Sequence, residues 1–322
     1  MAKVLTTTNL INTSLRRAMI PSDQSTFTCC DIIDIMNEEL GIHILPMVLR
    51  AHEEYYVVDE DVALVNGQSR YKIPYRAVGN KLRDVQYIDA SGAYYEMTRV
   101  SLEHRPDFQK SGVCGSLINF YVENDNIVLL CSTCSTGRLR MSYYLRPNDL
   151  VKNDRAAKIS AITAGACCCT VFTVSSFPTH LSCETSFDIV QGRSPNKIIA
   201  FDIGRASSDA VTKTMTFANS ELTDINLNGS STVQLSFSVG DYILSAEETI
   251  VAQLPAELQP ILAQRTSIKM LEALGDMEGM KMAQNELERM EYNAQTLIDN
   301  RVEGAPQKAV NRHSQLRFNN RR

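Results

Sequence analysis

The chain lacks the short motifs that mark common catalytic and nucleotide-binding sites. Its 322 residues contain no GxGxxG, no GxxxxGK followed by Ser or Thr, and no GxSxG. These patterns supply the phosphate-binding loop or the activated serine of many enzymes. Without them, the sequence predicts a protein that is not an enzyme and that binds no cofactor.

The sequence also lacks a segment suited to export or to crossing a membrane. Residues 1–20 scatter threonine, asparagine and arginine through what would be the apolar part of a secretory signal. The longest charge-free stretch, Ile159–Cys183, contains too many serine and threonine residues for the hydrocarbon core of a bilayer. We therefore expect a soluble protein with no membrane partner.

Nine cysteines are present, but their spacing suits neither a disulfide framework nor a zinc site. Cys131 and Cys134 have the spacing of metal ligands, yet no second pair follows nearby to complete a tetrahedral site. The consecutive Cys167, Cys168 and Cys169 would point to alternate faces of a strand, so we expect them to fill the core. The pattern predicts no bound metal and synthesis in a reducing cytosol.

Histidines and paired carboxylates indicate no site either. His43 and His52 are nine residues apart, which is not the spacing that places two metal ligands on one helical face. We interpret them as residues at helix ends. Adjacent carboxylates are usually solvated, and we expect this of Glu38-Glu39, Glu53-Glu54 and Glu247-Glu248.

Helical periodicity is strongest at the two ends of the chain. The candidates are Asn9–Ile20, a broken helix from Thr26 or Thr28 to Tyr56, a helix over Glu257–Leu274, and one from Met280 to Leu297. In the last of these, apolar residues recur at alternating steps of three and four, which is typical of an amphipathic helix. Gly275 is the expected stop between the two C-terminal helices.

Between these helices the apolar period changes to two, which predicts strands. In the first half, strands are expected at Tyr71–Ile73, Leu82–Ile88, Tyr94–Val100, Phe120–Leu130 and Leu139–Leu145, the last two forming a hairpin. In the Ser- and Thr-rich stretch that follows, they are expected at Cys169–Val174, Ser186–Val190, Lys213–Phe217, Val233–Phe237 and Tyr242–Ser245.

Together the patterns predict an α+β fold with a helical core. Residues 1–157 would supply N-terminal helices and β-hairpins, and residues 251–304 would return to the same core as C-terminal helices. Residues 158–250 would form a small inserted all-β module. Residues 305–322 would form an extended C-terminal arm.

The C-terminal arm differs from the rest of the chain in charge. Residues 301–322 carry six lysine and arginine side chains against the single Glu303, a formal charge of +5; because the whole chain carries −5, the preceding residues sum to −10. Ordering the arm would cost roughly 1–2 kcal/mol per residue, more than its few large apolar side chains return on burial. We expect an arm that is mobile until an acidic partner supplies a surface, although an ordinary frayed terminus has the same composition.

Several segments resemble the head-to-tail adaptor, or head-completion, proteins of short-tailed and crAss-like bacteriophages. They are Leu49–Tyr56 (LRAHEEYY), Gly79–Val85 (GNKLRDV), Met141–Asn148 (MSYYLRPN), Leu262–Arg265 (LAQR) through Leu271–Asp276 (LEALGD), and Asp299–Lys308 (DNRVEGAPQK). Together they span almost the whole chain. None is a catalytic motif, so the resemblance is one of overall pattern.

The resemblance implies a structural virion protein with a helical adaptor core, assembled beneath the portal as a ring of twelve subunits. It places the protein at the head–tail junction of the virion, after synthesis in the host cytoplasm. In that family a C-terminal extension reaches the portal, which corresponds here to Ala305–Arg322. The implied portal-binding residues are Lys308, Arg312, Leu316, Arg317, Phe318 and Arg321.

Further partners follow from the same resemblance. The inserted module would face outward, toward fibres or the next tail component. Genomic DNA would pass through the ring without sequence-specific binding, because a body near −10 repels the duplex. Two other classes stay open: a DNA-binding packaging accessory that uses the basic arm, and a cell-wall hydrolase carried in the virion.

Overall fold

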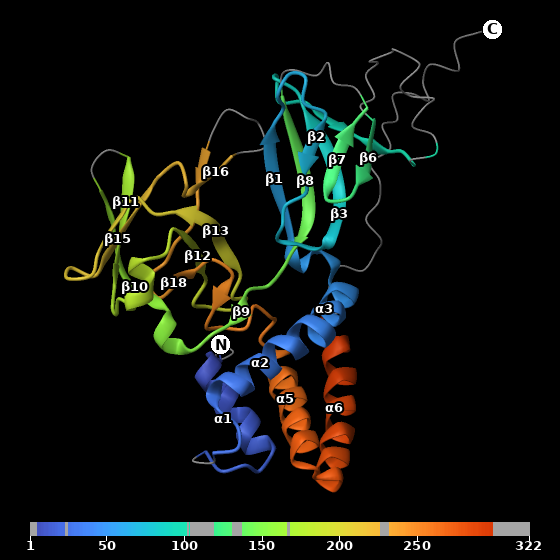
Figure 1. Ribbon diagram of the computed structural model, residues 1–322, viewed down its shortest axis with the longest axis vertical. Helices are drawn as coiled ribbons and strands as arrows, with labels where there is room; N and C mark the ends of the chain where they lie inside the picture. Colours follow the sequence, from blue (N-terminus) through green and yellow to red (C-terminus); the bar gives the residue numbers. More distant parts are fainter. Residues whose placement is uncertain are drawn as a thin grey trace.

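Three parts make up the protein, arranged along and beside its long axis (Figure 1). The structure is a computed structural model, and it describes residues 5–22, 25–101, 103, 119–130, 137–165, 168–225 and 232–298. The helical end comprises residues 5–56 and 250–298, the first β module residues 57–145, and the second β module residues 157–245. The two β modules lie side by side above the helices (Figure 1).

The helical end is built from two separate stretches of chain. Its elements are α1 (Thr7–Arg17), α2 (Cys29–Glu39), the π-helix η1 (Leu40–Ile44), α3 (Leu45–Ala51), the 3-10 helix η2 (Glu53–Tyr56), α5 (Gln259–Leu274) and α6 (Met277–Ile298). One apolar core joins them, with Leu10, Met36, Val48 and Leu262 completely buried. The N-terminal helices therefore depend on α5 for most of their core.

Local sequence signals set the helix ends. The Thr28 side chain accepts a hydrogen bond from the Asp31 backbone N–H, and the Asp31 carboxylate accepts one from the Thr28 N–H, which forms a capping box. Gly275 ends α5 in the left-handed conformation at φ +74°, where a residue with a side chain would be strained. Asp276 then accepts the Gly279 N–H at the start of α6.

The first β module is a sandwich of two four-stranded sheets. One has the order β1 (Val57–Ala63), β8 (Arg138–Leu145), β3 (Ala77–Ile88) and β4 (Tyr94–Glu96); the other has the order β2 (Arg70–Lys72), β7 (Asn126–Leu129), β6 (Asn119–Glu123) and β5 (Thr98–Arg99). Both sheets contribute to one core, including Ile127 from β7 and Met141 from β8.

The second β module is a curled seven-stranded sheet. Its order is β13 (Ile198–Gly204), β12 (Ser186–Val190), β18 (Tyr242–Ser245), β10 (Ala157–Ala164), β11 (Cys169–Val174), β15 (Thr214–Ala218) and β14 (Ser207–Asp209). β12 and β15 are four places apart in this order, yet the rings of Phe187 and Phe217 lie 5.8 Å apart and pack edge to face. The sheet therefore folds over its own apolar face.

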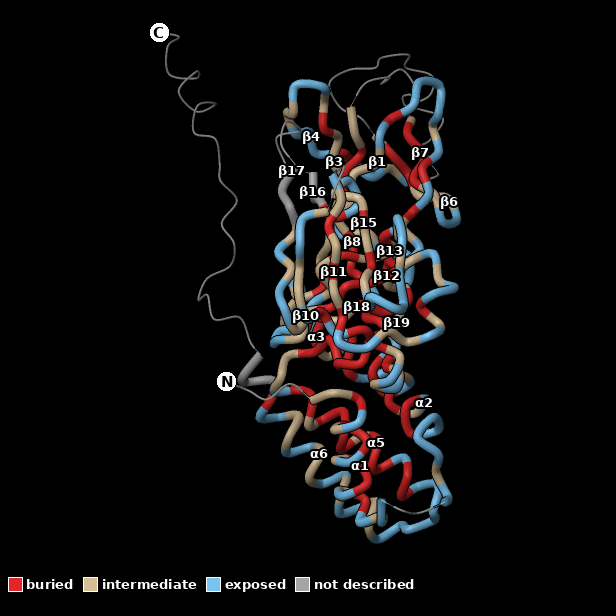
Figure 2. Tube along the Cα trace, turned by 90° about the vertical axis from the view of Figure 1, so that its left-hand side faces the viewer, coloured by how far each residue is buried: buried red, intermediate tan, exposed pale blue. Residues whose placement is uncertain are grey.

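Short elements connect the parts. A two-stranded sheet pairs β16 (Thr223–Ile225) with β17 (Thr232–Gln234), and β9 (Asp149–Leu150) runs parallel to β19 (Glu248–Thr249) at the base of the second module. The 3-10 turns η4 (Asn153–Arg155) and η5 (Thr179–Ser182) complete the described elements. Buried residues form a separate region in each part, with the red segments of Figure 2 running through both modules and the helices.

The predicted fold class, an α+β protein with a helical adaptor core, is wrong. Strands hold 35% of the described residues and helices 32%, and the largest sheet has seven strands. The strong helical periodicity at the chain ends is real, but those helices make only one of three large cores and lie at one end of the molecule (Figure 1). The predicted arm, residues 305–322, lies outside the described residues.

Candidate functional site

A buried ion pair fastens the first β module to the second. Arg76, between β2 and β3, donates to both carboxylate oxygens of Asp188 on β12 at 3.0 and 2.7 Å, and both side chains are almost completely buried. The Asn148 Nδ2 atom donates to the same carboxylate at 2.6 Å. The backbone N–H groups of Asp202 and Glu247 add bonds of 3.0 and 3.1 Å, and both residues have positive φ.

This cluster is structural. The Asp188 carboxylate accepts five hydrogen bonds and has no exposed surface, so no acceptor site is left for a substrate. A buried charge pair of this kind holds parts in register when every partner is satisfied. We conclude that the cluster positions the two β modules against each other.

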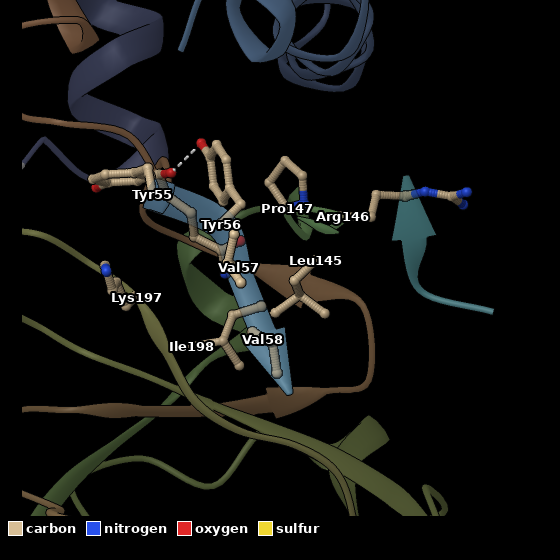
Figure 3. A pocket seen from close by; sticks show the side chains of 10 residues that line it. Tyr55, Tyr56, Val57, Val58, Leu145, Arg146, Pro147, Lys197 and Ile198 are labelled. Carbon is tan, nitrogen blue, oxygen red and sulfur yellow. Dashed lines mark hydrogen bonds between the residues drawn. The ribbon is translucent and has the colours of Figure 1, made fainter. Parts of the chain in front are cut away.

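A small cavity lies where all three parts meet (Figure 3). Its volume is about 70 Å³, and its wall comes from η2, β1, the end of β8, Lys197-Ile198 and Gln253. The Tyr56 hydroxyl donates to the Gln253 carbonyl at 2.7 Å, which is the dashed line in Figure 3. The Lys197 Nζ atom lies 5.0 Å from the Tyr55 ring centroid.

The cavity is too small for a metabolite. Pockets that bind small molecules usually enclose about 300–1,000 Å³, whereas this space suits only a few water molecules. Burial raises the pKa of Tyr55 and of Tyr56, so neither hydroxyl serves as a base near neutral pH. The cavity is a packing feature of the junction.

A larger hollow, the α5 furrow, runs along the exposed stripe of α5 between η1–α3 and α6. Its upper part, about 480 Å³, is lined by Ile42, Met47 and Arg50 on one wall and by Glu291 on the other. Its lower part, about 330 Å³, reaches Glu272 on α5 and Leu287 on α6. Both parts share His43 and Arg265, so they form one continuous surface.

The π-helix shapes the upper wall of the α5 furrow. A π-turn widens the helix and often marks functional sites. It lies between α2 and α3 and leaves Ile42 59% exposed next to His43. The upper wall of the furrow is therefore partly apolar and open to solvent.

Ion pairs line the middle of the furrow. Arg265 donates to Glu291 on α6 at 2.5 Å and lies 3.4 Å from Glu39 on α2, so it joins three helices. Lys269 pairs with Glu272 at 3.1 Å, and that carboxylate raises the pKa of Lys269. These basic side chains are therefore already neutralised within the chain.

α6 is only partly covered. Of its residues up to Ala294, only Ala294 is fully buried, while Met280, Ala283, Leu287 and Met290 pack against the core and stay half-buried. On the other side of the helix, Met282 is 69% and Tyr292 75% exposed. Figure 2 shows this contrast with the red interior of α5.

The predicted portal-binding residues lie outside the described residues, so the structure places none of them. They are Lys308, Arg312, Leu316, Arg317, Phe318 and Arg321. The same holds for Cys131, Cys134 and Cys167. Cys168 was expected to fill the core, and this is wrong: it has positive φ just before β11 and its side chain is exposed.

The structure confirms only some of the expectations for the histidines and the paired carboxylates. His52 caps the end of α3, which confirms the helix-end interpretation, whereas His43 lies within η1, 3.9 Å from Glu39. Glu39 was expected at the solvated surface, and this is wrong: it is 4% exposed and faces Arg265. Glu248 forms a two-bond pair with Arg155.

Comparisons with known proteins name no relative: the sequence matches no protein-family model and no curated protein. Within the described part of the chain, no group of three or more His, Cys, Asp or Glu side chains could hold a metal ion. No described helix has both the length and the hydropathy needed to cross a bilayer.

Sequence reasoning missed the Arg76–Asp188 cluster and the α5 furrow. The two partners of the ion pair are 112 residues apart, and neither belongs to a motif. The apolar step pattern that predicted α6 did not show that its seam would stay half-buried. Both features depend on how distant elements pack.

Replacing Cys131 or Cys134 by serine is expected to leave folding unchanged, because the sequence offers no second pair of zinc ligands. Thermal melting and metal analysis of the purified protein test this. Stoichiometric zinc that is lost together with stability in either variant would contradict it.

Proposed function

We propose that the protein is a structural subunit of a bacteriophage virion that forms a ring between the portal and the tail. The observation that carries this proposal is the exposure of α6, a 22-residue amphipathic helix. Its apolar seam is only half-buried against the core, and its other side exposes Met282 and Tyr292 to solvent. A second subunit that packs against the exposed side of α6 would bury Met282 and Tyr292. The resemblance of the sequence segments supplies the context of portal and tail.

The roles of the parts follow from this proposal. The ring is a dodecamer at the head–tail junction, and residues 305–322 dock on the portal. The second β module, which projects to one side of the long axis in Figure 1, faces fibres or the next tail component. Genomic DNA passes through the ring without sequence-specific contacts, since the chain before the arm carries a formal charge of −10.

The isolated protein is expected to be a monomer or weak oligomer that closes into a ring only on a portal template. The physical reason is that the arm, as the proposed portal contact, adds its stabilising contacts to the ring only when the portal is present. Native mass spectrometry of the protein alone, and mixed with the portal encoded in the same genome, measures this. The same closed ring in both samples would contradict it.

The contribution of α6 is tested with charged substitutions on its exposed side. Met282→Glu together with Tyr292→Glu should prevent ring closure on the portal while leaving the monomer folded. Val211→Glu together with Val239→Glu is the matched control, because both valines are exposed on the second β module, by 91% and 55%, and the net charge changes equally. Equal ring formation by both variants would show that α6 is not a subunit contact.

The two rival functions have their own signatures. A packaging accessory would bind duplex DNA with an affinity that falls steeply as salt rises. A virion hydrolase would release soluble fragments from peptidoglycan. Either result with the purified full chain would replace the proposed function.

A further inference from the structure

We propose that the α5 furrow binds residues 299–322 of the same chain, so that the free protein holds its own C-terminal arm. For this contact the arm means residues 305–322 together with the six residues before them. The furrow offers an apolar floor and wall, including the exposed Ile42 and the half-buried Met47, Met280 and Leu287. The arm brings Val302, Val310, Leu316 and Phe318, which have apolar side chains able to cover that surface.

Net charge favours the contact. The helical end, residues 5–56 and 250–298, contains 14 acidic and 7 basic residues, a formal charge of −7. Residues 299–322 contain six basic and two acidic residues, a formal charge of +4. The furrow lining itself is formally neutral, with Glu39, Glu272 and Glu291 against Arg50, Arg265 and Lys269, so the attraction comes from the surrounding helical end.

If the chain turns back along α5 after Ile298, charged residues of the arm come close to charged residues that line the furrow. Arg50 lines the upper part of the furrow, near the end of α6, and the first charged residue of the arm is Asp299. Lys308 and Arg312 come later in the arm, and Glu272 lies in the lower part of the furrow. Arg301 and Glu303 lie between these residues of the arm, so a descending arm meets furrow residues of both signs, with Lys308 and Arg312 able to reach Glu272.

Residues 299–322 are long enough to run along the whole α5 furrow. Glu291 lines the upper part of the furrow, and Ile298 follows seven residues later, about 10 Å along the helix. Twenty-four residues span up to about 80 Å when extended, whereas α5 with its 16 residues is about 24 Å long. The arm can reverse beyond Ile298 and still run the whole length of the furrow.

Attachment in the same chain makes even weak binding effective. A short flexible connection gives an effective concentration near 1 mM. A free peptide that binds with a Kd of about 100 µM would then, as the tethered arm, occupy the furrow about ten times more often than not. Any role of this contact in delaying ring assembly rests on the proposed function, whereas the binding itself does not.

The test uses a fluorescein-labelled peptide of residues 299–322. It is titrated with the full chain and with a shortened variant that ends at Ile298. Circular dichroism checks that both proteins are folded. Fluorescence anisotropy should show binding to the shortened variant that weakens as salt rises from 50 to 300 mM. The full chain should bind the peptide about tenfold more weakly, because its own arm competes.

Charge reversals locate the site. Glu38→Lys with Glu272→Lys in the shortened variant should weaken peptide binding at least fivefold, since Glu272 lines the furrow and Glu38 lies beside it, acting with Glu39 on Lys269. Glu278→Lys with Glu286→Lys changes the net charge equally on the side of α6 turned away from the furrow and is the matched control.

Three outcomes would overturn the proposal: no peptide binding below 1 mM, equal weakening by both reversals, or equal binding by the full and shortened chains. The last, if accompanied by dimers in sedimentation, would place the arm in the furrow of another copy. None of these readouts uses the portal, so they are independent of whether the portal captures the protein.

Discussion

Asp188→Ala should lower the free energy of unfolding by about 3–5 kcal/mol, because the buried Arg76 guanidinium loses its closest charge partner and keeps only Asp202 at 3.4 Å. It also removes the acceptor of the backbone N–H groups of Asp202 and Glu247. Urea unfolding of the purified variant measures the change. A loss this large is expected only where a buried charge is abandoned.

Two further variants test whether the loss of stability comes from the Arg76–Asp188 pair. Asp154→Ala removes an exposed carboxylate from η4 and should change the unfolding free energy by less than about 0.5 kcal/mol. In the Arg76→Ala variant, adding Asp188→Ala should lower the free energy of unfolding much less than it does in the parent protein. The reason is that Arg76→Ala has already removed the interaction between the two side chains. An Asp188→Ala loss below about 1 kcal/mol would show that the cluster does not fasten the modules.

Under the proposed function, deleting residues 305–322 should abolish portal capture and leave the body folded. The elements up to Ile298 have their own cores, and any contact of the arm with the α5 furrow lies at the surface, outside those cores. Reversal of Arg312 and Arg317 should reproduce part of the loss. Each exposed pair contributes only about 0–1 kcal/mol alone, but repetition around a ring multiplies the effect.

Portal pull-down and thermal melting of the truncated protein test this together. A truncated chain that binds portal at the parent strength would show that the arm is not the docking element. A fall of many degrees in melting temperature would show instead that the arm belongs to the body. The untruncated protein carrying Lys281→Glu on the surface of α6, which also makes the chain more negative, controls for a general charge effect.

Helices could be read from the sequence because their signals are local. The alternating steps that begin at Met280 and the stop at Gly275 predicted α6 and the end of α5, and Thr28 was one of two expected caps for α2. Strands with an alternating pattern and clear turns were also found: β11, β12 and β18 have the predicted bounds. In each case the decisive residues are neighbours in the chain.

Pairing between distant strands could not be read in the same way. The expected hairpin of Phe120–Leu130 with Leu139–Leu145 is wrong, because the first run turns at Asn124 and pairs with itself as β6 and β7. β8 instead lies between β1 and β3. The missed strand β1 (Val57–Ala63) carries three acidic residues and so lacks the alternating apolar pattern, but Asp61 is held by Arg140 across the sheet.

The sequence predicted even less of the α5 furrow than of the strand pairing. The apolar seam of α6 was visible in the sequence, but the hollow beside it is lined by η1, α3 and α5, which lie next to α6 only after folding. The Arg265 contacts with Glu39 and Glu291 likewise join three helices that are adjacent only after folding. A single sequence contains no signal for either arrangement.

The split origin of the helical end has a consequence for synthesis. On the ribosome, α1, α2 and α3 emerge first, yet α5, which covers them, begins at Gln259, roughly 200 residues after α3 ends at Ala51. At 5–20 residues per second that is a delay of about 10–40 s. Both β modules can form their cores during this interval, so the part that contains the earliest residues is the last to be completed, and its nascent helices are the segment most exposed to chaperones and proteases.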